Sequence, residues 1–199
     1  MIGYINTILK RWSSFKIDYR KKRPKSGAVL EWIETLIGAF IIAMILRQFV
    51  VQSSLVFSGS MIPTLRSATQ STHADRLIVN KLVYHFNPPD RGDIVLFNSP
   101  YGDGKQYVKR LIGLPNDNVE IRRGMVYIND KLLVIPGVTI RRDFSNLSKQ
   151  KVPTNSYFML GDNRSNSADS RVWGFVPKSE LIGEALFIYW PFNRIRWVK

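Results

Sequence analysis

The pattern of hydrophobic and polar positions changes once along the chain, near residue 52. Before that point, residues 35–46 form the uncharged apolar run TLIGAFIIAMIL, whose 12 residues alone would also suit an amphipathic or buried helix. Extending the run to residues 29–51 reaches the length that a bilayer requires, with Glu31, Glu34 and Arg47 near its ends, where charged heads can reach the interface. The longer count favours a membrane anchor at residues 27–51.

After residue 52 the helical pattern gives way to short runs of Val, Ile, Phe and Tyr between turn residues, which is typical of strands. Apolar and polar residues alternate at 118–122 and 194–198, as in half-buried antiparallel strands, and Arg123-Gly124 and Asn129-Asp130 are tight-turn signals. A helical turn is expected at 177–183 and a polar surface excursion at 143–154. Strands are predicted at 48–57, 76–82, 93–98, 106–112, 118–122, 125–128, 157–160, 183–190 and 194–198. The predicted fold is mainly β, an antiparallel, barrel-like catalytic domain behind a single N-terminal transmembrane helix.

The net charge of +14 comes from 29 basic and 15 acidic residues, and it is concentrated at the N-terminus. Residues 1–26 hold eight Lys and Arg against Asp18 alone. Cations beside a spanning segment stay on the cytoplasmic side, so 1–26 is predicted to be a basic cytoplasmic segment and 52–199 an extracytoplasmic domain. A cleaved secretory signal is not predicted, because the basic region is too long and residues 52–56 offer a poor cleavage site. The other basic residues form no Lys/Arg-rich run or aromatic RNA motif, so no nucleic acid partner is expected.

The chain has no cysteine and only two histidines, His73 and His85, each in a polar, loop-like context. Thiol nucleophiles, disulfides and zinc ribbons are therefore excluded, and neither a metal nor an organic cofactor is predicted. An enzyme with this composition must work mainly with Ser, Thr, Lys, Asp and Tyr.

The first segment that could carry chemistry is residues 57–65, FSGSMIPTL. Ser58 and Ser60 flank Gly59, whose backbone can turn or approach a ligand closely, and Pro63 fixes the exit. One hydroxyl could thus be held exposed while an amide points at the same space. The simpler alternative is a Ser-Gly turn followed by proline. The Gly-x-Ser-x-Gly elbow is absent.

The second segment is residues 106–115, QYVKRLIGLP, in which Lys109 interrupts an apolar strand. Arg110 projects to the opposite face, so one of the two cations is expected to point inward. Burial disfavours a charged lysine, and a neutral amine can activate a hydroxyl. The alternative is a pair of surface cations on an edge strand.

The third segment is residues 160–174, LGDNRSNSADSRVWG, which packs acidic, basic, amide and hydroxyl side chains closely together. Balanced charges followed by Trp-Gly favour a loop folded against a site, where donors and acceptors satisfy one another. A calcium loop is the rival interpretation, but interleaved arginines would repel the cation.

Five motifs in order resemble the conserved boxes of bacterial type I signal peptidases. They are SGSMIPTL at 58–65, DRLIVNK at 75–81, RGDIV at 91–95, YVKRLIGLP at 107–115 and GDNRSNSADSR at 161–171. The resemblance covers the anchor and nearly all of residues 52–176. It implies a membrane-bound endopeptidase with a Ser/Lys dyad that removes signal peptides from exported preproteins through an acyl-enzyme. Its implied partners are signal peptides and the lipid bilayer of the cell membrane, with an internal membrane such as the thylakoid as the alternative.

Carried over by position, the resemblance implies that Ser60 is the nucleophile and Lys109 the general base. The Ser58 hydroxyl and the Ser60 amide would form the oxyanion hole, and Ser167 would orient the lysine amine. Ionic support of the site is implied for Asp162, Asp169 and Arg171. Met61 and Ile62, next to the nucleophile, are candidates for the substrate pocket, which is expected to select small side chains.

The sequence departs from the family pattern in three places. Phe57 stands where members commonly have proline, only one membrane segment is found, and residues 131–156 leave room for only a small second β domain. Two other function classes stay open, a related Ser/Lys protease that cleaves itself or a regulator and a noncatalytic membrane-tethered β module. The oligomeric state is not predicted.

Overall fold

The computed structural model describes residues 10–12, 14, 17, 24–69 and 73–198, and these fall into two compact units that meet between Gln48 and Phe49. Most of the expected basic segment at 1–26 lies outside the described residues. In the first unit, helix α2 spans Pro24–Ile45 and continues into a π-helical turn, η1, at Leu46–Val50.

The helical stretch Val29–Val50 is the one described helix that is long and apolar enough to cross a membrane, judged by length and composition. Its large apolar side chains, among them Leu36, Phe40 and Ile41, are exposed. An apolar surface of this kind is unfavourable in water and is favoured in hydrocarbon.

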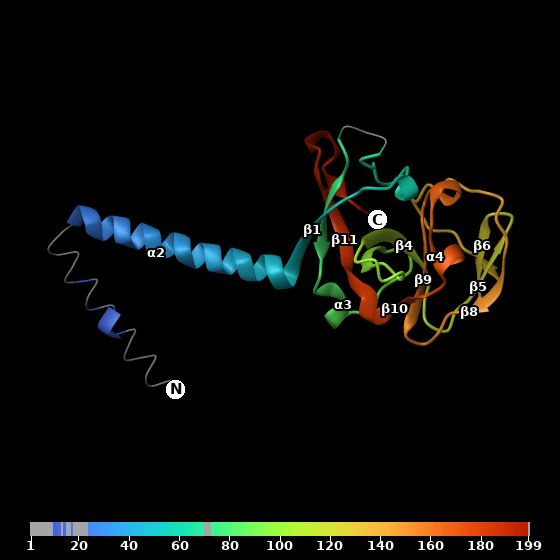
Figure 1. Cartoon of the computed structure of the whole chain (residues 1–199), viewed down its shortest axis with the longest axis horizontal. Helices are drawn as coiled ribbons and strands as arrows, with labels where there is room; N and C mark the ends of the chain where they lie inside the picture. Colours follow the sequence, from blue (N-terminus) through green and yellow to red (C-terminus); the bar gives the residue numbers. More distant parts are fainter. Residues whose placement is uncertain (1–9, 13, 15–16, 18–23, 70–72, 199) are drawn as a thin grey trace. The chain divides into compact units, whose positions relative to one another are not determined.

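The second unit is built from antiparallel strands, which confirms the predicted fold class (Figure 1). Its larger sheet has the order β1-β2-β11-β3-β4-β9-β10, with β12 paired to β11. The strands are β1 Val51–Leu55, β2 Arg76–Asn80, β3 Ile94–Asn98, β4 Gln106–Gly113, β9 Ser156–Leu160, β10 Val176–Pro177, β11 Leu181–Trp190 and β12 Arg196–Trp197.

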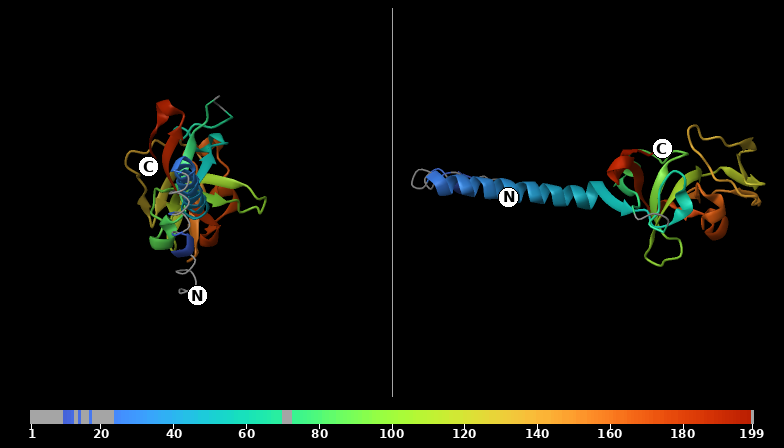
Figure 2. Two further views of the ribbon diagram at one scale, coloured as in Figure 1. Left: turned by 90° about the vertical axis from the view of Figure 1, so that its left-hand side faces the viewer. Right: turned by 90° about the horizontal axis from the view of Figure 1, so that it is seen from above.

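A smaller sheet with the order β7-β6-β5-β8 lies to one side of the larger one within this unit (Figures 1 and 2). Its strands are β5 Asn118–Arg122, β6 Met125–Ile128, β7 Lys131–Leu132 and β8 Leu147–Lys151. Arg123 and Gly124 join β5 to β6, and both have positive φ, 49° and 75°. This is the backbone of the tight hairpin turn that the sequence predicts.

Short helical segments connect these strands. They are η2 Gly59–Met61, α3 Val83–Phe86, η3 Arg164–Asn166, α4 Ser170–Trp173, η4 Lys178–Glu180 and η5 Phe192–Arg194. The turn η4 confirms the helical turn expected at 177–183, whereas α3 and α4 were not predicted.

Both faces of the larger sheet are covered. On β3, Ile94 and Leu96 enter one apolar cluster, while Val95 and Phe97 enter another. A strand that is buried on both faces has a continuous run of apolar residues, which explains the sequence IVLF at 94–97. A third cluster, including Val119 of β5, lies under the smaller sheet.

Three predictions about local structure are wrong in whole or in part. Residues 147–151, placed in a polar surface excursion, form β8 and pair with β5. Their side chains are mostly exposed or half-buried, so no apolar pattern marks the strand. The strand predicted at 194–198 shrinks to Arg196–Trp197, because η5 occupies the residues before it. Likewise β1 begins only at Val51, since 46–50 are helical.

Candidate active site

Ser60 lies in the short turn η2 that follows β1. Gly59, Ser60 and Met61 are all buried, and Ser60 is 3% exposed. Ser58, just before the turn, has extended backbone, and its hydroxyl oxygen lies 3.0 Å from that of Ser60. The two predicted serines therefore present their hydroxyl groups to one another.

Lys109 reaches the same hydroxyl from β4. Its Nζ lies 2.5 Å from Ser60 Oγ, and the residue is 2% exposed. The strand alternation sends the neighbouring Arg110 to the opposite face, as predicted, but Arg110 is fully buried as well. The expectation that one of these cations points inward is met by Lys109, and the burial of Arg110 was not predicted, because it depends on the cover over both faces of β4.

Aromatic rings form one wall around the Lys109 amine. Its Nζ lies 5.9 Å from the centroid of the Tyr107 ring and 6.0 Å from that of Trp173. These two rings stack with centroids 5.3 Å apart, and Tyr101 packs edge-on against Trp173. Trp173 Nε1 is the buried side-chain polar atom that has no hydrogen-bond partner among the described residues.

Burial lowers the pKa of Lys109 to about 8 from its usual 10.5. Removal from water is the largest cause, because it penalises the charged amine. Asp169 and Asp162 oppose the shift by attraction, and Arg171 reinforces it by repulsion. An appreciable fraction of the amine is therefore neutral in mildly alkaline solution and can accept a proton from a hydroxyl.

The buried guanidinium of Arg110 is paired with Asp162. Its Nε and Nη2 donate to the two carboxylate oxygens at 2.8 and 2.7 Å, and both side chains are fully buried. Arg110 Nη1 also donates to the carbonyl oxygen of Gly92, at 2.7 Å. Thr64 donates to the same carboxylate at 2.5 Å, which ties the segment after Ser60 to this ion pair.

The loop at residues 161–171 holds the backbone around Ser60. The Asn163 amide donates to Ser60 O at 2.9 Å, and the Asn163 side chain donates to Gly59 O at 3.0 Å. A Cβ at Gly161 would lie 2.5 Å from Ser60 O and 2.3 Å from the Ser167 hydroxyl. Only glycine fits this close approach of two backbones.

Arg171 and Asp169 brace this loop, as the resemblance implies. Arg171 Nε donates to Asp169 at 2.8 Å, and its Nη1 donates to Asp143 at 2.5 Å. Asp169 also accepts from the Gly161 amide at 3.1 Å. The Ser167 hydroxyl donates to the Ala168 carbonyl, at 3.5 Å, and its expected role in orienting the lysine amine stays a prediction.

Several residues of this site were not singled out in advance. Asp143 lies in the stretch interpreted as a surface excursion, and no pattern marks it. Arg110 was considered only as the outward neighbour of the lysine, although a second cation in an apolar strand is itself a signal of a buried ion pair. The Trp-Gly at the end of the loop was noted, but not as the wall around the amine. Asn163 was noted only as one polar residue of the loop.

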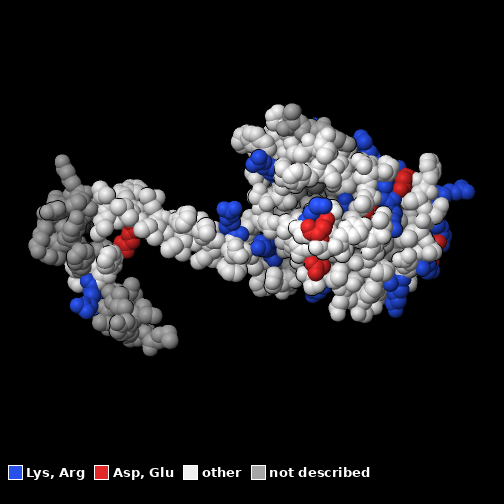
Figure 3. Space-filling model, viewed as in Figure 1, with Lys and Arg blue, Asp and Glu red and all other residues white. Residues whose placement is uncertain are grey.

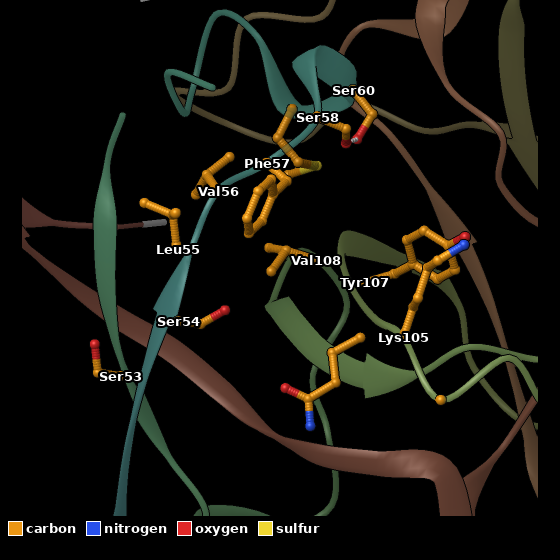
Figure 4. A pocket seen from close by; sticks show the side chains of 13 residues that line it. Ser53, Ser54, Leu55, Val56, Phe57, Ser58, Ser60, Lys105, Tyr107 and Val108 are labelled. Carbon is orange, nitrogen blue, oxygen red and sulfur yellow. Dashed lines mark hydrogen bonds between the residues drawn. The ribbon is translucent and has the colours of Figure 1, made fainter. Parts of the chain in front are cut away.

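A groove of about 670 Å³ leads to Ser60. Figure 4 shows Ser58 and Ser60 at one end of it and Ser53 and Ser54 at the other. Met61 lines the groove as predicted, whereas Ile62 is half-buried and outside its lining. Residues 53–58 and 104–108 form most of the remaining lining.

Two strand edges border this groove. β1 is the edge strand of the larger sheet, and β4 pairs with β9 only from Arg110 onward. The start of β4, residues 106–108, therefore has one edge without a neighbouring strand. At the far end, the Gln52 side-chain amide donates to the Gln106 side chain at 2.9 Å. Unpaired strand edges of this kind can bind an extended peptide through main-chain hydrogen bonds.

A hydroxyl bonded to a desolvated amine at the end of a peptide-sized groove has the chemistry that a serine hydrolase with a lysine base requires. Comparison with known proteins identifies the family. Residues 29–190 match the family described as signal peptidase, peptidase S26, so the chain belongs to this family. It is therefore a serine endopeptidase of the signal peptidase I kind, and its family function is the removal of signal peptides.

Two relatives match most of the chain in sequence, and one solved structure matches about half of it. Signal peptidase I of Leptolyngbya laminosa is 39% identical over 181 residues, which cover 87% of this chain and 86% of that protein. Signal peptidase I S of Bacillus subtilis is 37% identical over 183 residues, 86% of this chain and 95% of the relative. A crystal structure of a signal peptidase I from Enterococcus faecalis is 37% identical and covers 49% of this chain and 97% of that one, with a TM-score of 0.41.

Proposed function

We propose that Ser60 and Lys109 are the catalytic dyad of this enzyme. The contact of 2.5 Å between Lys109 Nζ and Ser60 Oγ, with both residues buried, is the observation that carries the proposal. Ser60 is the nucleophile and the neutral amine is its base. No other described base lies within hydrogen-bond distance of this hydroxyl.

In the proposed reaction, Lys109 takes the Ser60 proton as the serine oxygen attacks the scissile carbonyl. The tetrahedral intermediate breaks down when the ammonium gives its proton to the leaving amine, which yields an acyl-enzyme. The amine then takes a proton from water, the hydroxide attacks the ester, and the proton returns to Ser60. Each step moves one proton among Ser60, Lys109, the substrate and the attacking water.

The Ser58 hydroxyl and the Ser60 amide are proposed to stabilise the oxyanion. Ser58 Oγ lies 3.0 Å from Ser60 Oγ, which places a donor beside the atom that will carry the new bond. Asp162, Asp169 and Arg171 support the site through the buried ion pair and the loop contacts. For Ser167 we propose a steric role, since its hydroxyl packs against Gly161 at the back of the nucleophile.

The substrate is proposed to bind as an extended strand between β1 and the start of β4. Met61 forms the floor next to Ser60, and Val108 lies between the groove and the sheet core. We expect small substrate residues next to Ser60, because Met61 and Val108 would clash with bulky ones there.

The helix at residues 27–51 is proposed to anchor the enzyme in the cell membrane, with residues 1–26 in the cytoplasm and 52–199 outside. The exposed apolar helix supports an anchor, and the basic composition before it supports this orientation. Because the chain has no native cysteine, single cysteines at Ser13 and Ser148 can report the orientation. An impermeant maleimide applied to intact cells should label only Ser148→Cys, and labelling of Ser13→Cys instead would reverse the topology.

The dyad is tested by a purified-protein assay on a preprotein in detergent, with Ser60→Ala and Lys109→Ala beside the wild type. Both variants should lose cleavage while keeping the far-UV circular dichroism of the wild type, because each change removes side-chain atoms and leaves the backbone hydrogen bonds of the strands in place. Self-cleavage without preprotein cleavage would favour the regulatory-protease alternative. Unchanged cleavage in either variant would remove that residue from the dyad.

A further inference from the structure

A second, smaller cavity lies in the same unit, between the smaller sheet and the loop at residues 161–171. It holds about 130 Å³, the liquid volume of about four water molecules. Its apolar wall includes Val126, Leu133, Ile135 and Ile140, and its polar side is formed by two arginines, Arg142 and Arg164. The groove that leads to Ser60 shares none of these residues.

Arg164 is 5% exposed, yet it has no acidic hydrogen-bond partner among the residues that the structure describes. Its Nε donates to the Gly161 carbonyl at 3.0 Å. No hydrogen bond to a described residue involves Nη1 or Nη2, and the side chain lines the cavity. A guanidinium carries five donors, so four of them remain for a ligand.

The acidic groups near Arg164 are engaged elsewhere. Asp143 and Asp169 bond to Arg171, and Asp162 bonds to the buried guanidinium of β4. Burial and repulsion from Arg171 lower the pKa of Arg164 to about 10, although these carboxylates act to raise it. Arg164 thus remains a cation in a place where its charge is poorly compensated.

The surroundings add to this positive charge. Figure 3 shows Lys and Arg gathered over the part of the domain formed by the smaller sheet. Arg142 is exposed and lines the cavity beside Arg164. Buried charges are normally paired, so an uncompensated guanidinium that faces an open cavity is the arrangement expected of an anion site.

We propose that this cavity binds the carboxylate of a short aliphatic acid, with Arg164 and Arg142 holding the two oxygens. A guanidinium matches a carboxylate in a bidentate pair. The apolar wall and the volume suit an attached chain of about three or four carbons, which a bare inorganic anion would leave unfilled. The same chemistry is offered by a free acid and by the carboxyl end of a peptide whose last residue is small.

The test titrates the full chain in deuterated detergent micelles and follows ligand binding by saturation-transfer NMR. Butyrate stands for the free acid, N-acetylalanine for the chain end, and butyramide is the neutral control of equal size. Saturable binding is expected for at least one of the two carboxylates and not for butyramide. Tighter binding of butyrate would identify the ligand as a free acid, and tighter binding of N-acetylalanine would identify it as the carboxyl end of a peptide. Equal binding of butyramide and butyrate would overturn the proposal, as would inorganic phosphate that displaces butyrate with a dissociation constant below that of butyrate.

Variants locate the site. Arg164→Gln and Arg142→Gln should each raise the dissociation constant for butyrate about tenfold or more, because each removes a charge-assisted hydrogen bond. Arg123→Gln is the matched control, since Arg123 is an exposed arginine of the neighbouring turn outside the cavity lining, and it should change the constant less than about twofold. Because Arg142 is exposed, Arg142→Gln should fold, and its butyrate affinity tests the site even if Arg164→Gln fails to fold. Equal affinities in the Arg142 and Arg123 variants would refute the site.

Discussion

Replacing Lys109 by methionine should stabilise the fold near neutral pH. Burial lowers the lysine pKa from 10.5 to about 8, a difference of about 2.5 units, and each unit corresponds to about 1.4 kcal/mol. The folded protein therefore bears a cost of about 3 kcal/mol for the charged amine below pH 8. Methionine keeps similar apolar bulk but loses the bond to Ser60, which is worth about 1 kcal/mol. The net gain expected at pH 7 is about 2 kcal/mol.

The sign of this effect should change with pH. Below pH 8 both states of the wild type hold the lysine proton, and the full cost is present. Between about pH 8 and 10.5 the unfolded state binds more protons than the folded state, so the stability of the wild type rises with pH. The stability of the methionine variant does not rise over this pH range, because the variant lacks the titrating amine. Its advantage should shrink and then become a deficit of about 1 kcal/mol above pH 10.5.

Urea unfolding of the full chain in micelles, followed by tryptophan fluorescence from pH 6.5 to 11, measures this difference. Lys105→Met is the matched control, because the Lys105 side chain is 71% exposed and pairs with Asp103 at the surface. Its difference from the wild type should stay nearly constant up to about pH 10. A stability difference for Lys109→Met that does not vary with pH would refute the argument that burial lowers the pKa of Lys109 to about 8.

Other measurements follow from the same geometry. If Lys109 is the base, kcat/KM for a peptide substrate should rise about tenfold between pH 7 and 9, as the neutral fraction grows around a pKa of about 8, and a flat profile would contradict this role. Ser58→Ala should lower kcat about 100- to 1000-fold with unchanged circular dichroism, whereas Ser54→Ala, in the same groove, should have little effect. Asp162→Asn should cost about 3 to 5 kcal/mol in urea unfolding, because it leaves the Arg110 guanidinium buried without its partner, and a loss below about 1 kcal/mol would speak against this pairing.

Much of the fold follows from local patterns, and its failures have local causes. Alternation at 118–122 predicts β5 correctly, because Val119 and Ile121 face a core while their neighbours face outward. β8, at 147–151, carries no such pattern, since it is an edge strand with little burial. Its identity depends on pairing with β5, which lies about thirty residues earlier and leaves no trace in the local sequence.

The site was less accessible to such reasoning. Composition leaves lysine as the best base, but no periodicity brings a turn at residue 60 to a strand at residue 109, and their pairing came from the resemblance to a family. The expectation that one of Lys109 and Arg110 points inward missed the burial of the other, because it treated β4 as a strand with one solvent face. Coverage of both faces is a tertiary property, and it leaves room for a buried ion pair behind the lysine.

Asn163 donates hydrogen bonds to the backbone of Gly59 and Ser60. Asn163 and Gly59 are 104 residues apart in the sequence. A ribosome adds about 5 to 20 residues per second, so about 5 to 20 s of translation separate the two ends of this contact. Nascent chains shorter than about 160 residues consequently lack the polypeptide that holds the turn carrying Ser60. Proteolytic competence must therefore arrive late in biosynthesis, and incomplete translation products should be inert.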